Sequence, residues 1–172
     1  IAQEASQLAS RFEWLDTLPE KFTGLVLGNE VLDAMPVELL TWRAGAVFER
    51  GIALQDGRFA WAEQALTPGS LLEQANALPP AQFVSGEAAY TSEISLAAQG
   101  FMRSLAPMLE RGLILMLDYG FGQSEYYHPQ RAQGTLMCHY RHHAHADPFL
   151  FPGLQDITAH VDFSAIARAG TE

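Results

Sequence analysis

The sequence predicts an α/β protein built on a parallel sheet. Two short apolar runs, over residues 25–27 and 113–117, are bounded by glycine and lack polar alternation. Such runs are typical of strands that are buried on both faces of a parallel sheet. Each run ends abruptly in polar residues, and in open α/β sheets ligands bind beyond the carboxyl ends of the strands. We therefore expect a site at the shared edge of these two strands.

The composition describes a globular chain with an acidic surface. Its 172 residues correspond to one domain or part of one, and 48% are hydrophobic, which allows a sizeable core. The formal net charge of -10 argues against nucleic acid or an anionic membrane as partner and suits a basic partner. The single cysteine, Cys138, cannot form an internal disulfide and indicates a reducing compartment. No membrane span or signal peptide is visible, and the start at Ile1 is typical of a piece of a longer protein.

The chain before the first apolar run is expected to form a helix and a short strand. Apolar residues at helical spacing predict a helix over residues 1–11. Brief alternation predicts a strand over residues 12–15 that ends in a turn at Asp16. A helix followed by strands without tight turns is consistent with a parallel sheet.

Polar residues follow the first apolar run at once. Asn29 and Glu30 come directly after Gly28, and Asp33 lies one helical turn later, before Pro36 stops the turn. Polar residues at these positions lie where a ligand site is expected, but Asn29 and Asp33 are equally well placed to cap a turn.

Between the two apolar runs we expect an antiparallel insertion and two helices. The insertion covers about residues 37–66, with three β-rich stretches over residues 37–42, 47–54 and 58–61 and a hairpin signal at Asp56-Gly57. A helix over residues 71–78 and an extended piece over residues 83–87 follow. The clearest helix begins at Ser92-Glu93 and meets a stop signal at Gly112, with Pro107 near its end.

The second apolar run ends in Asp118-Tyr119-Gly120 and so repeats the layout seen at Gly28. Two parallel strands with acidic groups at their ends face one crevice, which is more specific than either motif alone. Beyond them we expect a loop over residues 122–129, a strand over 135–140, a short strand or turn over 156–162 and a last helix over 165–169.

The motifs of several other enzyme classes are missing. Four histidines lie between residues 139 and 145, but their spacing matches no zinc pattern and no cysteine pair accompanies them, so no metal site is expected. Residues 120–124 do not form the nucleophile elbow of a hydrolase. Neither a dinucleotide fingerprint nor a P-loop is present, and we interpret Cys138 as a strand residue.

Several ordered motifs resemble one family. Residues 28–37, Gly-Asn-Glu-Val-Leu-Asp-Ala-Met-Pro-Val, resemble the N-E-x-x-D-A-L-P signature of the MidA family, and residues 117–120 resemble its I-D-Y-G strand end. Further matches follow in the family's order at residues 127–131, 134–136, 140–143, 147–148, 152–153 and 156–163. The resemblance extends from about Trp14 to the end, is weak over residues 42–89, and fits the bacterial members better than the mitochondrial ones.

The resemblance implies a class I, Rossmann-like methyltransferase that uses S-adenosylmethionine; the family includes the mitochondrial complex I assembly arginine methyltransferase. Residues 25–27 and 113–117 would then be the fourth and fifth strands of the sheet. The family's glycine-rich loop and the acidic residue that holds the ribose are not found in this sequence. Residues 1–172 are therefore expected to be a partial methyltransferase domain that alone binds the cofactor poorly and is inactive.

The resemblance and the residue chemistry together assign roles to the polar residues. A carboxylate pair can orient a planar guanidinium and expose the lone pair of one nitrogen, so an arginine acceptor calls for carboxylates. The predicted catalytic residues are Glu30, Asp33, Asp118 and His160; the predicted cofactor contacts are Asp16 and Asn29; the predicted substrate contacts are Tyr119, His128 and Asp162. Asp162 is also placed to cap the last helix.

The expected partner is a protein substrate with an accessible arginine, such as a subunit of respiratory complex I. An uncovered sheet edge also allows a homo-oligomer. The expected location is the cytoplasm of a bacterium, or the mitochondrial matrix for a eukaryotic protein. The alternative hypothesis is a non-catalytic binding or assembly module on the same fold, which would tolerate Glu30→Gln. A dehydrogenase is the weaker alternative because no dinucleotide fingerprint is visible.

Overall fold

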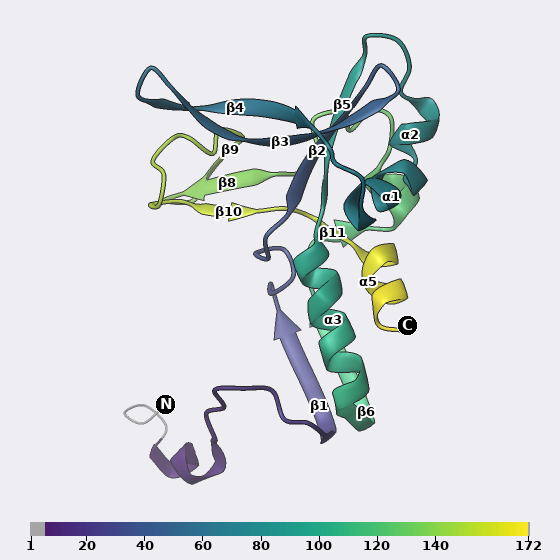
Figure 1. The fold of residues 1–172 in the computed structure, drawn as a ribbon. Helices are drawn as coiled ribbons and strands as arrows, with labels where there is room; N and C mark the ends of the chain where they lie inside the picture. Colours follow the sequence, from purple (N-terminus) through teal and green to yellow (C-terminus); the bar gives the residue numbers. More distant parts are fainter. Residues whose placement is uncertain (1–5, 172) are drawn as a thin grey trace.

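The computed structural model describes residues 6–171, and it has a mixed α/β architecture (Figure 1). It contains a parallel pair of strands: β1 (Phe22–Asn29) lies beside β6 (Leu109–Leu117). The ladder runs in register from Thr23 opposite Arg111 to Asn29 opposite Leu117. This confirms the prediction that the two apolar runs are adjacent parallel strands with their ends at the same edge.

Two glycines allow the backbones of this pair to approach closely. Gly24 and Gly112 face each other in the ladder, and a Cβ on Gly112 would collide with the carbonyl oxygen of Gly24. Gly112 also has a φ of 147°, which L-residues rarely adopt. Gly112 therefore lies within β6. The prediction that it ends the preceding helix is wrong.

One face of the parallel pair is covered and the other is open. Val26, Ile114 and Met116 pack against a cluster formed by α3 (Leu96–Met108) and α5 (Phe163–Ala169). The alternate positions point to the other face and are exposed; they are Leu25, Leu27, Leu113, Leu115 and Leu117. Within the described residues, the prediction of burial on both faces is therefore wrong, because helices cover one face only.

The predicted antiparallel insertion is present as a four-stranded sheet with the order β4-β3-β2-β5. Its strands are β2 (Glu38–Arg43), β3 (Ala46–Gln55), β4 (Arg58–Ala65) and β5 (Ala89–Ile94). Asp56 and Gly57 have φ values of 50° and 75°, as a type I′ hairpin turn requires. The sheet extends past the predicted insertion because β5 pairs with β2 along its whole length.

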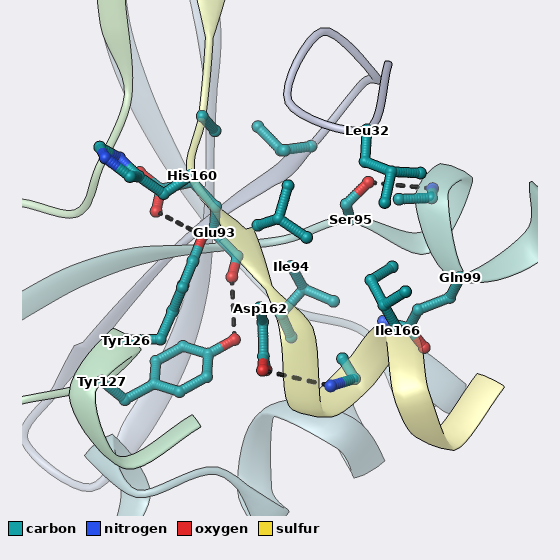
Figure 2. Close-up of a pocket in the computed structure, with 15 residues that line it drawn as sticks. Leu32, Glu93, Ile94, Ser95, Gln99, Tyr126, Tyr127, His160, Asp162 and Ile166 are labelled. Carbon is teal, nitrogen blue, oxygen red and sulfur yellow. Dashed lines mark hydrogen bonds between the residues drawn. The ribbon is translucent and has the colours of Figure 1, made fainter. Parts of the chain in front are cut away.

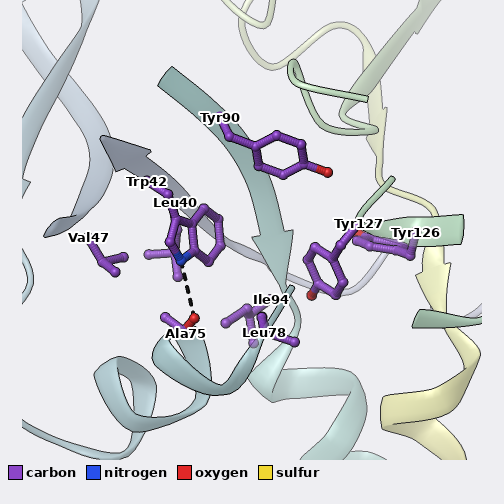
Figure 3. Packing of buried hydrophobic residues seen from close by; sticks show 9 residues of the cluster. All are labelled: Leu40, Trp42, Val47, Ala75, Leu78, Tyr90, Ile94, Tyr126 and Tyr127. Carbon is purple, nitrogen blue, oxygen red and sulfur yellow. Dashed lines mark hydrogen bonds between the residues drawn. The ribbon is translucent and has the colours of Figure 1, made fainter. Parts of the chain in front are cut away.

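The main core lies under this antiparallel sheet (Figure 3). Trp42 and Tyr90 meet edge to face, with ring centroids 6.2 Å apart. The predicted helix over residues 71–78 is present as α1 (Ser70–Ala77), and the Trp42 Nε1 donates to the Ala75 carbonyl at 3.1 Å. The buried members of this core are Leu40, Trp42, Val47, Ala75, Leu78, Tyr90, Ile94, Tyr126 and Tyr127.

Three predicted elements are corrected. The long helix begins at Leu96 with Ser95 as its N-cap, because the residues before it complete β5. The stretch predicted as extended over residues 83–87 follows a short helix, α2 (Pro80–Phe83). Residues 12–15 form no strand because no described strand lies beside them; the segment before them is a 3₁₀ helix (Ser6–Arg11), and residues 1–5 of the predicted helix lie outside the described part.

The chain after β6 forms small elements around the end of the parallel pair. β7 (Gly120–Phe121) pairs in parallel with β11 (Val161–Asp162), and a helix of one turn, α4 (Gln123–Tyr126), lies within the predicted loop. A three-stranded antiparallel sheet has the order β10-β8-β9 and consists of β8 (Met137–Tyr140), β9 (His143–His145) and β10 (Asp156–Thr158). Figure 1 shows β8 and β10 beyond the tip of β1.

Candidate active site

Polar residues follow both parallel strands at the same edge. The ladder continues one residue past β1, because the Glu30 amide donates to the Leu117 carbonyl at 2.8 Å. Glu30 has a φ of 51°, an uncommon conformation for a residue other than glycine, and this turns the chain out of the sheet. Strained backbone of this kind is frequent at functional sites, so Glu30 is a natural candidate. Asn29 and Tyr119 are exposed beside it.

Asp118 holds the turn that follows Glu30. Its carboxylate accepts hydrogen bonds from the backbone amides of Val31, Leu32 and Asp33, at 3.4, 3.2 and 3.1 Å. These amides would otherwise be unpaired at the start of the turn. The predicted catalytic residue Asp118 thus lies at the site, with its oxygens bound to the backbone that carries Asp33.

Asp33 is the half-buried carboxylate of the site. Burial, and next the charge of Asp118, raise the pKa of Asp33 above its usual value. Within the described part of the chain, its buried Oδ1 has no hydrogen-bond partner. A buried acceptor without a donor is costly, so Asp33 is suited to receive an N–H group from a ligand. Its carbonyl oxygen accepts from the Ala159 amide at 3.0 Å and ties the turn to the segment after β10.

These side chains border an open cavity of about 460 Å³, which we call the acidic cleft. Its floor consists of Glu30, Asp33 and Tyr119, and its roof consists of Met137, His139, Asp156, Thr158, Ala159 and His160. The roof follows from strand alternation: Met137 and His139 line the cleft, whereas Cys138 between them is fully buried. Three carboxylates and two histidines therefore surround one cavity.

His160 is held at the junction of floor and roof. Its ring stacks on Phe121 with centroids 5.3 Å apart and an interplanar angle of 24°. Its backbone amide donates to the hydroxyl of Thr135 at 3.0 Å. His160 therefore lines the same cavity as Glu30 and Asp33.

A second hollow, of about 210 Å³, adjoins the acidic cleft. It is lined by Asn29, Glu30, Leu117, Asp118 and Tyr119, so it shares Glu30 and Tyr119 with the cleft. The exposed amide of Asn29 offers both donors and an acceptor to a bound ligand. A ligand in this hollow would also contact residues of the acidic cleft.

Three predicted site residues lie elsewhere. Asp16 is exposed in the segment that leads into the start of β1, whereas Asn29 is the last residue of that strand. His128 accepts from the hydroxyl of Tyr90 through its carbonyl, at 3.1 Å, and its side chain does not line the acidic cleft. Asp162 accepts hydrogen bonds from the amides of Ser164 and Ala165 and caps α5. This confirms the alternative prediction that Asp162 caps the last helix.

Sequence reasoning missed three residues that shape the site. His139 and Asp156 face each other in the β8–β10 register and both line the roof. The alternation of polar and apolar residues around each was a signal, but strands this short are hard to recognise. The third is Glu93, a buried carboxylate that borders a smaller cavity of about 30 Å³ (Figure 2).

Two kinds of feature are absent from the described residues. No group of three or more His, Cys, Asp or Glu side chains is arranged to hold a metal ion among them. No helix in residues 6–171 is long and apolar enough to cross a membrane.

Comparison with known proteins decides the family. The model of a family of S-adenosyl-L-methionine-dependent methyltransferases matches residues 1–172, the whole chain. The chain belongs to this MidA-type methyltransferase family. The resemblance in the sequence motifs is thereby confirmed, and so is S-adenosylmethionine as the cofactor of the family.

Individual relatives agree with the family. A crystal structure of a protein from Burkholderia thailandensis bound to S-adenosyl-homocysteine is 50% identical, with a TM-score of 0.88 over 99% of this chain and 43% of that one. The mitochondrial protein arginine methyltransferase NDUFAF7 homologues are 32% identical in Drosophila melanogaster and 27% identical in Caenorhabditis elegans. These matches cover 88% and 91% of this chain, which spans about a third of the length of those relatives.

Proposed function

We propose that the full-length protein transfers a methyl group from S-adenosylmethionine to a guanidinium nitrogen of arginine in a protein substrate. The observation that carries this proposal is the acidic cleft, where Glu30, Asp33 and Asp156 line one cavity next to the hollow at Asn29. Sequence similarity to the arginine methyltransferase homologues supports it. The net charge of -10 also favours a basic segment as substrate.

The residues of the cleft suit a planar cation. Carboxylates bind guanidinium groups through paired hydrogen bonds, which fix the plane of the group as well as its position. Glu30 on the floor and Asp156 on the roof are both exposed to the cleft and can contact the same ligand. Asp33 can receive one further N–H on the buried oxygen that lacks a partner among the described residues.

Asn29 and the neighbouring hollow are assigned to the cofactor. When bound, S-adenosylmethionine supplies a methyl carbon on a sulfonium that leaves as a neutral thioether. The acceptor nitrogen must approach that carbon with its lone pair free, and orientation of this kind supplies much of the acceleration in group transfer. The protein's task is therefore to hold the guanidinium with Glu30 and Asp33 and to accept the proton that the nitrogen loses. Asp33, whose pKa is raised by burial and by Asp118, and His160 are the acceptors at hand.

The partner we propose is a protein that presents arginine on an accessible segment, and a subunit of respiratory complex I is the first one to test. The 50% identity to a bacterial protein supports a bacterial source, for which we propose a cytoplasmic location.

The experiment compares two Glu→Gln variants of the full-length protein. Glu30→Gln should lower methyl incorporation into an arginine-containing acceptor by at least about 100-fold, because a group that stabilises the transition state is lost. Glu87→Gln, an equally conservative change at an exposed turn before β5, should leave it unchanged. Both variants should melt like the parent, since surface substitutions rarely alter stability.

Two results would refute the proposal. One is equal transfer to an acceptor in which lysine replaces the arginine, because a lysine cannot engage two carboxylates in a plane. The other is full methyl transfer by Glu30→Gln, because the proposal requires this carboxylate to hold the guanidinium.

A further inference from the structure

A buried carboxylate lies between the antiparallel sheet and the roof of the acidic cleft. Glu93, in β5, is 1% exposed and does not line the cleft itself. Figure 2 shows it beside Tyr126, Tyr127 and His160. A buried charge is costly unless it is hydrogen-bonded, so its partners show what it holds in place.

The groups around the Glu93 carboxylate are donors. The Thr135 amide donates to it at 2.9 Å, the Leu136 amide at 3.1 Å and the Thr135 hydroxyl at 3.1 Å. The Tyr126 hydroxyl adds a longer bond at 3.3 Å. Burial raises the pKa of Glu93, and the bonds from Thr135 and Leu136 act in the opposite direction. Glu93 thereby fixes the backbone immediately before β8.

The segment before β8 is shaped to reach this carboxylate. The Thr91 amide donates to the Ala132 carbonyl at 3.0 Å and lays the segment alongside β5. Gly134 follows with a φ of 74°, and a Cβ at this position would collide with the Glu93 Oε1. Glycine at this position therefore allows the contact for two independent reasons.

Thr135 connects Glu93 to the acidic cleft. Its hydroxyl donates to Glu93 and accepts from the backbone amide of His160 at 3.0 Å. One threonine thus joins the start of β8 to the segment that follows β10. The roof consists of residues from β8, from β10 and from the two positions directly after β10, so this threonine joins the two ends of the roof.

We propose that Glu93 is a positioning residue for methyl transfer, which acts through Thr135 on His160 and on the roof of the acidic cleft. The proposal rests on the proposed function. A displacement of about 1 Å in a supporting residue can lower the rate of a group transfer by about 100-fold, so this support has consequences for turnover. A buried polar group with a purely structural role would affect folding alone.

The test uses matched variants of the full-length protein at two buried threonines. Thr135→Val removes the hydroxyl, and Thr135→Ser keeps it. Thr41→Val is the control, because Thr41 is also buried and its hydroxyl contacts Thr91 within the four-stranded antiparallel sheet, where neither residue lines the cleft. Kinetics with an arginine acceptor, the affinity for S-adenosyl-homocysteine and backbone hydrogen exchange are measured for each.

Thr135→Val should lower kcat/KM by about tenfold, and Thr135→Ser should restore it to within about twofold of the parent, because one hydrogen bond to His160 is lost and regained. The affinity for S-adenosyl-homocysteine should stay within about twofold of the parent, since Thr135 does not line the hollow at Asn29. Exchange of the His160 amide should accelerate in Thr135→Val and stay unchanged in Thr41→Val. Glu93→Gln should reproduce the kinetic loss of Thr135→Val.

The proposal is overturned if Thr135→Val keeps the parent's kcat/KM, if Thr41→Val loses as much activity, or if Thr135→Ser is no better than Thr135→Val. It is also overturned if the His160 amide exchanges at the parent's rate in Thr135→Val. This last readout needs no acceptor, so it tests the contact between Thr135 and His160 separately from the proposed function. If the parent fails to methylate arginine, the proposed function falls whatever the exchange rate is.

Discussion

The floor and the roof of the acidic cleft are held in place by different means. The floor follows two strands of eight and nine residues, whose ladder is regular from Thr23 onward. The roof is formed by strands of four and three residues and depends on the side chain of Glu93, which comes from another sheet. The floor is therefore placed by a long regular ladder, with its turn held by Asp118 next to it, whereas the roof depends on a carboxylate from another sheet. We expect changes to the floor to affect the reaction step as well as acceptor binding, and the change of Asp156 in the roof to affect acceptor binding.

The largest effect should come from the residue that holds the floor together. Asp118→Ala removes the acceptor of three backbone amides, so the free energy of unfolding should fall by about 2 kcal/mol, the upper range for a lost capping residue. Methyl transfer should fall by at least about tenfold as well, because Asp33 loses its fixed position. Denaturant melts and kinetics with an arginine acceptor measure the two effects.

The matched control is Asp162→Ala, which removes a similar cap from α5. It should lower stability by about 1 kcal/mol with transfer retained, because Asp162 does not line the acidic cleft. Equal losses of transfer in both variants would show that the floor has no special part in the reaction.

On the roof, Asp156→Asn should raise KM for the arginine acceptor by about tenfold and leave kcat within about twofold of the parent. The reason is the loss of a charge-assisted hydrogen bond, worth about 1.5 kcal/mol or more. Asp147→Asn, in the loop between β9 and β10, makes the same change of net charge outside the cleft and should leave KM unaltered. A fall in kcat without a change in KM would reverse the assignment of binding to the roof.

Acceptor binding should also depend on pH through Asp33. Burial and then Asp118 raise its pKa above 3.8, so Asp33 takes up a proton at a higher pH than an ordinary aspartate does. The protonated form offers no charge to a guanidinium, so KM should rise severalfold as the pH falls through that pKa. Asp33→Asn should have a raised KM at every pH and lack this dependence. If the KM of Asp33→Asn changed with pH in the same way as that of the parent, Asp33 would be excluded as the titrating group.

The same raised pKa has a consequence for stability. Below pH 3.8 the carboxyl is neutral in both the folded and the unfolded chain, and above its folded pKa the charged form is disfavoured by folding. Asp33→Asn should therefore be at least as stable as the parent at pH 7, and any gain should vanish below about pH 3.8. Melting curves at the two pH values provide the comparison.

The smallest effect is expected at His128. Its carbonyl, and not its ring, anchors the hydroxyl of Tyr90, and the ring does not reach the acidic cleft. His128→Ala should therefore change KM and kcat by less than about twofold, as surface substitutions usually do. A tenfold rise in KM would restore the substrate contact that the sequence had predicted.

The floor could be predicted from the sequence because its signals are local. Two apolar runs fix two strands, and the polar residues after them must lie at the same edge once the strands are parallel. That reasoning brought Asn29, Glu30, Asp118 and Tyr119 together, as the structure does. It could not tell that the Asp118 oxygens bind backbone amides, because the direction of a side chain depends on the turn opposite it.

The roof could not be predicted because its signals are short or distant. Three-residue strands carry too little periodicity to be recognised, so Asp156 was left without a role. Glu93 was assigned to the start of a helix, since its partners Thr135 and Leu136 lie 42 and 43 residues further along the chain. β5 was missed for the same reason, because its partner β2 lies on the other side of the insertion in the sequence.

The central claim is that floor and roof act on one bound guanidinium. A double-mutant cycle of Glu30→Gln and Asp156→Asn in the full-length protein, read as kcat/KM for an arginine acceptor, tests this most directly. Two carboxylates that share one ligand should show a coupling energy of at least about 0.5 kcal/mol between their effects. Effects that add to within about 0.3 kcal/mol would contradict the claim, because they would mean that the two carboxylates do not hold the same group.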